Sequence, residues 1–536
     1  MARMARISRS LVVLAALALA APGAAAQTPA PRNVRQPSPQ AVARAVATIT
    51  EADIRAGIGV LADDSMRGRE TPSPELEQAA QWVAAQFRRI GLRPGGDSGG
   101  YIQRFPLREK QMDSSFALTI TGGGSTRRAL FGREVAILGN QVPTVRGAHP
   151  VVLVTGIPAD SGDPFAGVSL RGAAVVHVLA QGQLRGSVVN PLIMRGFAEG
   201  MASWTFVVQP PDQQWAGLTR AALRTEWELV GGNAASRDGL PVVLAVRDST
   251  VADLLRAAGV DPAAFRANPT FTARPLAGWQ VGAEPAWRTL REPTVPNTVG
   301  VLPGGDRTLR DEFVVFTAHM DHVGYIAPDG SGRCAIAGAD SICNGADDNA
   351  SGTVGIVELA QAYAALNPRP ARTMVFVAVS AEERGLFGAW HYTRHPVGSL
   401  DRTVAVIDLD MVGRNARDSI ETPGKDYSTL GALAGSLAAE HPELGLALND
   451  PPAQRVYWQL SDHYPFAAQG VPALFFFSGQ HPDLHRAGDS LDRMDSDKAT
   501  RVIRLAFYTG LAVANAAARP SLTDAGRAAV AGAGGH

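Results

Sequence analysis

The sequence predicts an α/β fold, in which a mainly parallel, mixed sheet is flanked by helices and a β-rich domain is inserted. From about residue 293 onward, near-continuous apolar strand patterns alternate with helical patterns. Buried strands that alternate with helices are typical of a parallel sheet covered on both faces. Between residues 117 and 274, short β-branched runs alternate instead with Gly, Asp and Pro turns, which predicts a separate module.

Length and composition limit the remaining possibilities. The 536 residues suggest two or three domains, and 46% hydrophobic against 19% charged residues allow sizeable cores. Equal numbers of acidic and basic residues, with a formal net charge of +0, argue against nucleic acid as a partner. After the first 26 residues no apolar stretch is long enough for a transmembrane helix, so we expect no stable membrane insertion.

The N-terminus has the features of an export signal. Arginines at positions 3, 6 and 9 precede an apolar run at 11–21, and Ala24-Ala25-Ala26 fits a small-residue cleavage site before Gln27. The run is short for a membrane anchor, which is the alternative interpretation. We therefore expect residues 1–26 to be a signal peptide, residues 27–49 to be a flexible leader, and the mature protein to be periplasmic or secreted.

The predicted elements follow one another in a clear order. Apolar residues recur at helical spacing between 50 and 92, which predicts helices within an N-terminal segment, residues 50–116. The β-rich inserted domain covers 117–274, the regular strand–helix alternation falls within 275–518, and the Ala/Gly-rich tail, 519–536, is expected to be disordered. Strands are predicted at 151–154, 174–178, 242–246, 313–317, 373–379, 404–409 and 473–477, and helices at 249–259, 352–366, 386–393, 430–440 and 499–516.

Polar clusters follow most of the strands predicted within residues 275–518. Open α/β sheets build their sites at the carboxyl ends of strands, so these clusters are expected to meet. Two adjacent acidic pairs and two histidines form the ligand set of a two-metal hydrolase. The clusters are His319 with Asp321, Asp347-Asp348, Glu382-Glu383, Asp408 with Asp410, and His485.

Two zinc ions about 3.5–4 Å apart repel strongly, so such a site needs a bridging carboxylate. Asp347, before a helix that starts near Ser351, is the candidate bridge, and an ordinary capped loop is the alternative. Of the adjacent Glu382 and Glu383, one can bind metal while the other faces the bound water as general base. An acidic pair that opens a helix is the alternative for these two.

The histidines leave a choice of ligands. Asp321 follows His319 by two residues, and a carboxylate so placed commonly fixes the tautomer of a metal-bound imidazole. His322 is another possible ligand, but we assign it to the loop. Near the C-terminus the choice lies between His481 and His485, and we prefer His485, which lies further from the strand in a loop that would close over the site.

The order and spacing of these motifs resemble co-catalytic zinc aminopeptidases of the bacterial leucyl aminopeptidase and aminopeptidase Y type, in metallopeptidase clan MH. The resemblance covers residues 293–518 and 50–105, and the segment Arg67-Gly68-Arg69-Glu70-Thr71 is also similar to the family. It implies a zinc-peptidase α/β/α fold, a catalytic domain whose N-terminal part is residues 50–116 and whose main part is residues 275–518, and two Zn²⁺ per chain. By this resemblance, His319 and Asp410 hold one zinc, Glu383 and His485 hold the other, Asp347 bridges, Glu382 is the general base, and Asp321 orients His319.

The middle segment resembles the protease-associated domain that is inserted into such peptidases. Asp163-Pro164-Phe165-Ala166-Gly167, followed by the apolar run at 170–176, is similar to its turn and strand. Domains of this kind are thought to shape substrate access or bind partners. This resemblance therefore does not by itself indicate a reaction.

Two cysteines, Cys334 and Cys343, lie between the His319 and Asp347 motifs. In an oxidising compartment a disulfide that closes this short loop is plausible. Free thiols and metal binding are the alternatives, although two thiolates alone suit hard-ligand zinc chemistry poorly. We expect the disulfide.

The implied activity is that of an exported zinc aminopeptidase acting on peptides. Ser461, Asp462 and Tyr464 are expected to line the substrate side, or else to begin a helix with its cap. Alternatives are a carboxypeptidase of the same clan that holds an acidic C-terminal residue through arginines, a single-zinc glutaminyl cyclase, and a non-catalytic binding protein. The arginines near these motifs are Arg384, Arg414 and Arg455.

Overall fold

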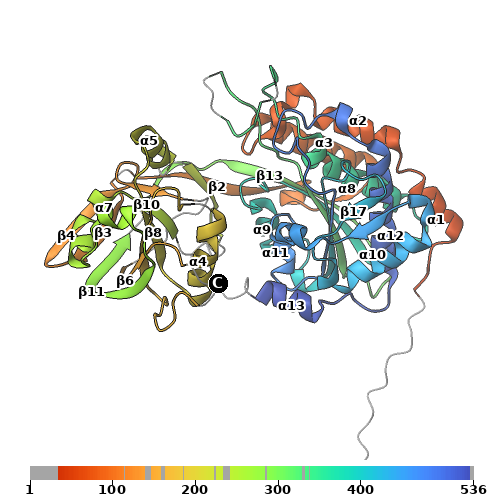
Figure 1. The fold of residues 1–536 in the computed structure, drawn as a ribbon. Coiled ribbons are helices and arrows are strands. Elements are labelled where there is room, and N and C mark those ends of the chain that lie inside the picture. Colours follow the sequence, from red (N-terminus) through yellow and green to blue (C-terminus); the bar gives the residue numbers. More distant parts are fainter. Residues whose placement is uncertain are drawn as a thin grey trace, which may run out of the picture.

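The computed structural model consists of a large catalytic lobe and a smaller lobe formed by the inserted segment (Figure 1). The predicted signal peptide lies outside the described residues. No helix among the described residues is long and apolar enough to cross a membrane. The structure describes residues 34–113, 115–138, 147–158, 163–184, 186–221, 225–232, 242–283, 287–328, 332–336 and 338–531.

The catalytic lobe is built on an eleven-stranded mixed sheet. Its four central strands run parallel in the order β15-β14-β16-β19, and antiparallel strands extend the sheet on both sides. β1 (Arg93–Pro94) pairs with β13, and β9 (Thr225–Leu229) pairs with β2. The sheet order is β12 (Trp287–Arg291), β2 (Ile102–Met112), β13 (Thr294–Leu302), β15 (Thr373–Val379), β14 (Phe313–His319), β16 (Thr403–Asp410), β19 (Ala473–Phe477), β17 (Ser419–Glu421) and β18 (Ala447–Asn449).

Helices cover both faces of this sheet. Alternate residues of β14 point to opposite faces, so Val314 and Phe316 join one core and Val315 joins the other. α9 (Phe387–Arg394) and α11 (Tyr464–Ala467) pack on the face of Val315. The helices on the other face are α1 (Pro39–Val46), α2 (Glu51–Leu61), α3 (Pro74–Ile90), α8 (Gly352–Ala364), α10 (Thr429–Glu440) and α12 (Ser496–Asn515).

The inserted lobe has an eight-stranded sheet of its own, with β6-β7-β8-β10 parallel at its centre. Separate apolar cores lie on its two faces. The strand order is β4 (Ser125–Leu130), β3 (Ala117–Gly122), β11 (Thr272–Ala283), β6 (Ala148–Thr155), β7 (Ala174–Val178), β8 (Ser203–Val207), β10 (Val242–Val246) and β5 (Val135–Ile137). The helices of this lobe are α4 (Gly186–Glu199), α5 (Asp212–Ala221), α6 (Ala252–Ala257) and α7 (Pro262–Ala267).

The structure departs from the expected boundaries in three places. β11 continues the inserted sheet to Ala283, beyond the expected limit at residue 274, because its second half pairs with β3. The leader is not wholly flexible, since α1 is capped by Ser38 and buries Ala45 and Val46. The expected disordered tail contains α13 (Asp524–Ala531), whose Val530 packs against the core beside α11.

Candidate metal centre

The carboxyl ends of the four central parallel strands carry the predicted ligands to one edge of the sheet. His319 is the last residue of β14 and Asp410 the last residue of β16. Glu382 and Glu383 follow the end of β15, and His485 lies in the loop after β19. The parallel register therefore brings together residues that are far apart in the sequence, as expected for an open α/β sheet.

One group of candidate metal ligands consists of His319, Glu382 and Asp410, whose ligand atoms lie within 4.8 Å of one another. His319 Nε2 is 3.2 Å from Asp410 Oδ1 and 4.0 Å from Glu382 Oε2. His319 is 1% exposed and Asp410 is 8% exposed, so the group lies below the surface.

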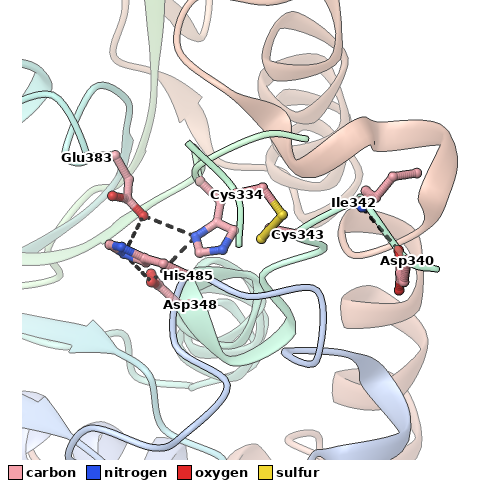
Figure 2. The surroundings of a disulfide bond; sticks show 8 residues. Cys334, Asp340, Ile342, Cys343, Asp348, Glu383 and His485 are labelled. Atoms are coloured by element: carbon pink, nitrogen blue, oxygen red, sulfur yellow. Dashed lines mark hydrogen bonds and ion pairs between the residues drawn. A yellow bond between two sulfur atoms is a disulfide. The ribbon is translucent and has the colours of Figure 1, made fainter. Parts of the chain in front are cut away.

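The second group consists of His322, Asp348, Glu383 and His485. Glu383 Oε1 lies 3.1 Å from His322 Nδ1 and 3.2 Å from His485 Nε2. Figure 2 shows Asp348, Glu383 and His485 beside the disulfide. Our assignment of His322 to the loop missed its place here, because its motif already offered His319 and Asp321.

Asp348 links the two groups. Its Oδ1 is 3.4 Å from His319 Nε2, whereas its Oδ2 is 3.4 Å from His322 Nδ1 and 3.3 Å from His485 Nε2. The two oxygens of one carboxylate thus face different ligand groups. This is the arrangement that a bridging ligand requires.

The structure does not place Asp347, the predicted bridge, in either group. Its Oδ1 accepts a hydrogen bond of 2.7 Å from Gly413 N, and its Oδ2 lies 3.5 Å from His481 Nε2. Asp347 and His481 therefore lie beside each other and belong to neither group. The neighbour, Asp348, has non-helical backbone angles (φ −102°, ψ 94°) and turns its carboxylate into the site.

Asp489 and Arg69 hold the loop that carries Asp348. The carboxylate of Asp489 accepts hydrogen bonds of 3.0 Å from the backbone N–H groups of both Asp347 and Asp348. At Gly345 (φ 59°), a Cβ would lie 2.2 Å from the carbonyl oxygen of Asp348, so only glycine fits. The guanidinium of Arg69 donates to backbone carbonyls of Leu61, Met320, Asn344 and Gly345.

We did not assign roles to Arg69 or Asp489 from the sequence. The available signals were the segment 67–71, which is similar to the family, and the position of Asp489 four residues after His485. Burial lowers the pKa of Arg69 to about 10, against the opposing effect of nearby carboxylates such as Asp348 and Asp489. The side chain therefore stays charged at neutral pH.

Asp321 orients His319 in a different way from the one predicted. His319 Nδ1 is 3.0 Å from the backbone carbonyl of Asp321 but 4.0 Å from its carboxylate. Since a carbonyl only accepts, Nδ1 carries the proton and Nε2 is free to bind a cation. The Asp321 carboxylate instead accepts from the Thr71 hydroxyl at 2.8 Å and from Glu382 N at 3.2 Å.

The three expected substrate-side residues have different surroundings. The Ser461 hydroxyl donates to Asp410 Oδ2 at 2.8 Å and to Asp408 Oδ2 at 3.0 Å, so it fixes a candidate ligand. Asp462 is fully buried, and both of its carboxylate oxygens lack a hydrogen-bond partner. Tyr464 is partly buried and meets Trp390 edge to face.

The electrostatics of the site favour bound cations. Asp348, Glu382, Glu383 and Asp410 converge in a buried region, where charges are costly unless they are paired or bind metal. Burial and neighbouring carboxylates raise the pKa of Glu382 well above its usual range. Burial opposes protonation of His485, but hydrogen bonds to Asp348 and Glu383 outweigh it and raise the pKa to about 10.

The residues present fit zinc. Imidazole nitrogens and carboxylate oxygens are the usual ligands of catalytic zinc, and each group offers both. His485, with its side chain 45% exposed, leaves one side of the second group accessible.

The predicted disulfide between Cys334 and Cys343 is present in the structure. Both cysteines are buried and pack with Val323 and Ile326 in a small cluster of their own. They therefore bind no metal, and the loop they close lies next to the second ligand group (Figure 2).

Comparison with known proteins gives one family match. Residues 297–510 match the model of Peptidase family M28. A "Probable zinc metalloprotease" of Pyrenophora tritici-repentis is 24% identical over 270 residues, which cover 42% of this chain and 53% of the relative. The chain thus spans about half the length of the curated relatives it matches.

Two solved structures are similar to the chain over most of its length. An aminopeptidase from Aneurinibacillus sp. strain AM-1 is 17% identical, with 90% of this chain and 97% of that chain covered and a TM-score of 0.48. A zinc aminopeptidase from Bacillus subtilis is 16% identical, with 86% and 94% covered and a TM-score of 0.44.

Proposed function

We propose, from the match of residues 297–510 to Peptidase family M28, that the protein is an exported aminopeptidase that uses two zinc ions. The observation that carries the proposal is the position of Asp348, whose two carboxylate oxygens face separate groups of His and carboxylate ligands. His319 and Asp410 would hold one ion, Glu383 and His485 the other, and Asp348 would bridge them. His322 contributes a further nitrogen beside the second ion.

Glu382 is the proposed general base. When bound, the zinc pair would polarise the substrate carbonyl and make water more acidic. Glu382 Oε2 lies at the edge of the first ligand group, and its backbone N–H is fixed by Asp321 Oδ1. Because burial raises its pKa, this carboxylate is a better proton acceptor than an exposed one. It would take the proton of the attacking water and return it to the leaving amine.

The charged side chains near the site argue against binding of a substrate C-terminus. Each arginine suggested for binding a carboxylate already pairs with one in this chain: Arg384 with Glu70, Arg414 with Asp483, and Arg455 with Asp450. Asp462 lacks a hydrogen-bond partner but is fully buried, and burial and the neighbouring Asp408 raise its pKa well above the usual range, so we assign it no contact with the substrate.

Apolar side chains next to the site form a packed cluster. Met411 follows Asp410 directly and Leu484 precedes His485, and both pack with Tyr457, Phe475 and Phe477. The cluster therefore supports the segments that carry these two candidate ligands. The export proposal rests on the predicted signal peptide and on the disulfide, which is typical of oxidising compartments.

The test compares metal content and substrate class in the full-length protein. We expect two zinc ions per chain by elemental analysis and hydrolysis of leucyl-p-nitroanilide but not of its N-acetylated form. Arg455→Ala should leave KM for the free-amine substrate unchanged, because this half-exposed arginine already pairs with Asp450 and is not expected to bind the substrate. Preferential hydrolysis of acidic C-terminal residues would contradict the aminopeptidase proposal.

A further inference from the structure

The disulfide-closed loop contacts the second ligand group from one side. Next to Cys334, Ala335 N donates to the carbonyl of His485 at 3.0 Å, and Ala487 N donates to the carbonyl of Ala335 at 3.1 Å. These two bonds flank Arg486 and fix the backbone directly after His485. On the other flank of Cys334, Arg333 reaches Glu383 Oε2 at 3.6 Å.

The Cys343 end of the loop contacts the segments of the other two ligands. Cys343 N donates to the carbonyl of Gly324 at 3.0 Å, shortly after His322, and Gly324 N donates to Gly68 O at 3.2 Å. The chain then runs from Cys343 through Asn344 and Gly345 into the loop of Asp348. All four members of the second group are thus linked to the covalently closed loop.

The first ligand group depends on this loop only through Asp348, whose Oδ1 lies 3.4 Å from His319 Nε2. His319 and Asp410 lie at the ends of adjacent strands, β14 and β16, which the hydrogen-bond ladder of the sheet fixes. Ser461 and the carbonyl of Asp321 orient their side chains further. His485, by contrast, lies in a loop, has a left-handed backbone (φ 56°) and keeps a half-exposed side chain. Of the candidate ligands, His485 therefore depends most on contacts from other segments to keep its position.

We propose that the Cys334–Cys343 disulfide positions His485 and its partners, so that breaking it weakens metal binding at the second position and spares the first. The inference rests on the proposed two-zinc function. A disulfide with a purely structural role would change the stability of the chain without separating the two positions. Groups that support metal ligands commonly change metal affinity by about 10–100-fold when removed.

The decisive variant is Cys334→Ser/Cys343→Ser in the full chain. Zinc-loaded protein is dialysed against increasing dipicolinate, and retained zinc per chain is counted by elemental analysis. We expect wild type and variant to load two ions, and the variant to release one ion at about 10–100-fold lower chelator concentration. The other ion should leave as in wild type. Loading with ¹¹³Cd resolves the two positions, and the signal missing from His485→Ala identifies the second one.

Two further variants keep the proposal falsifiable if the double variant folds poorly. Ala335→Pro keeps the disulfide but removes the N–H that binds the carbonyl of His485, and should show the same selective loss. Asp340→Ala changes the same loop without contact to either ligand group and should release metal as wild type does.

The outcomes separate this inference from the proposed function. Suppose that the wild type binds two ions. If the double variant then released both ions at the same chelator concentration, or released neither at a lower concentration than wild type, the positioning role alone would be overturned. A lower melting temperature with unchanged metal release would do the same. A wild-type chain that binds no zinc would overturn the proposed function as well.

Discussion

At the scale of single residues, adjacent acidic side chains separate into different surroundings. Glu383 contacts His322 and His485, and its pKa is lowered well below the usual range because those contacts outweigh burial. Glu382, one residue earlier, lies with His319 and Asp410 and has a raised pKa. Neighbours in sequence therefore have opposite acid–base character, which is the division of labour expected of ligand and base.

This division predicts different results for matched amide variants. Glu383→Gln removes an anionic ligand and should lower zinc content together with activity. Glu382→Gln should keep both zinc ions and the fold, but kcat should fall by about 10²–10⁴ because general-base catalysis is lost. Elemental analysis and steady-state kinetics on the same preparations measure both effects. If Glu382→Gln lost zinc while Glu383→Gln kept it, Glu382 would be the ligand and Glu383 the general base.

The other acidic pair shows where sequence reasoning stops. The motif identified Asp347-Asp348 as a pair, and residue chemistry alone does not distinguish its members. Which of the two carboxylates enters the site depends on the backbone angles of the loop. Asp489, from a distant part of the chain, fixes these angles by accepting hydrogen bonds from the backbone N–H groups of Asp347 and Asp348. His322 and the carbonyl of Asp321 were missed for the same reason, since main-chain direction in a loop is not encoded in residue type.

At the scale of elements, the apolar strands were the most predictable part of the molecule. The predicted strands at 373–379 and 473–477 have the bounds of β15 and β19, because fully buried parallel strands are continuous apolar runs. The strands that we did not predict, such as β12 and β9, are partly exposed and rich in charged residues. Their pairing with β2 depends on tertiary contacts rather than on a local pattern.

The short helical segment at Asp64–Arg69 illustrates how an irregular element stabilises the site. Arg69→Met should lower the free energy of unfolding by about 3–5 kcal/mol, because four backbone carbonyls lose their donor and nearby carboxylates lose a cation. Arg67→Met is the matched control, since Arg67 is half-exposed over the ring of Tyr325, and should cost less than about 1 kcal/mol.

Urea unfolding of metal-free protein followed by circular dichroism measures both losses. Metal-free samples keep the stability effect separate from zinc binding. Equal destabilisation by the two arginine variants would show that the contacts of Arg69 with the loop do not contribute specifically to the free energy of unfolding.

At the scale of the whole molecule, the inserted segment is attached to the catalytic lobe by more than its two ends. Between β8 and β10 of the inserted sheet, the chain returns to pair β9 with β2 of the catalytic sheet. Trp227 of β9 is 8% exposed and packs with Phe105, Leu107 and Ala381, the residue before Glu382. The guanidinium of Arg384 also lies over Trp227, 5.5 Å from the centroid of its ring.

This packing predicts that the inserted segment influences catalysis through Trp227. Trp227→Ala should destabilise the protein by about 3–5 kcal/mol and, by loosening Ala381, lower kcat more than it raises KM. Trp279→Ala is matched, because Trp279 is equally buried (7%) but packs only within the inserted core. It should lose comparable stability while kcat stays within about twofold of wild type, since effects at distant sites are usually independent. If kcat changed equally in the two variants, the inserted lobe as a whole, and not Trp227 in particular, would influence the site. If kcat changed in neither variant, β9 would have only a structural role.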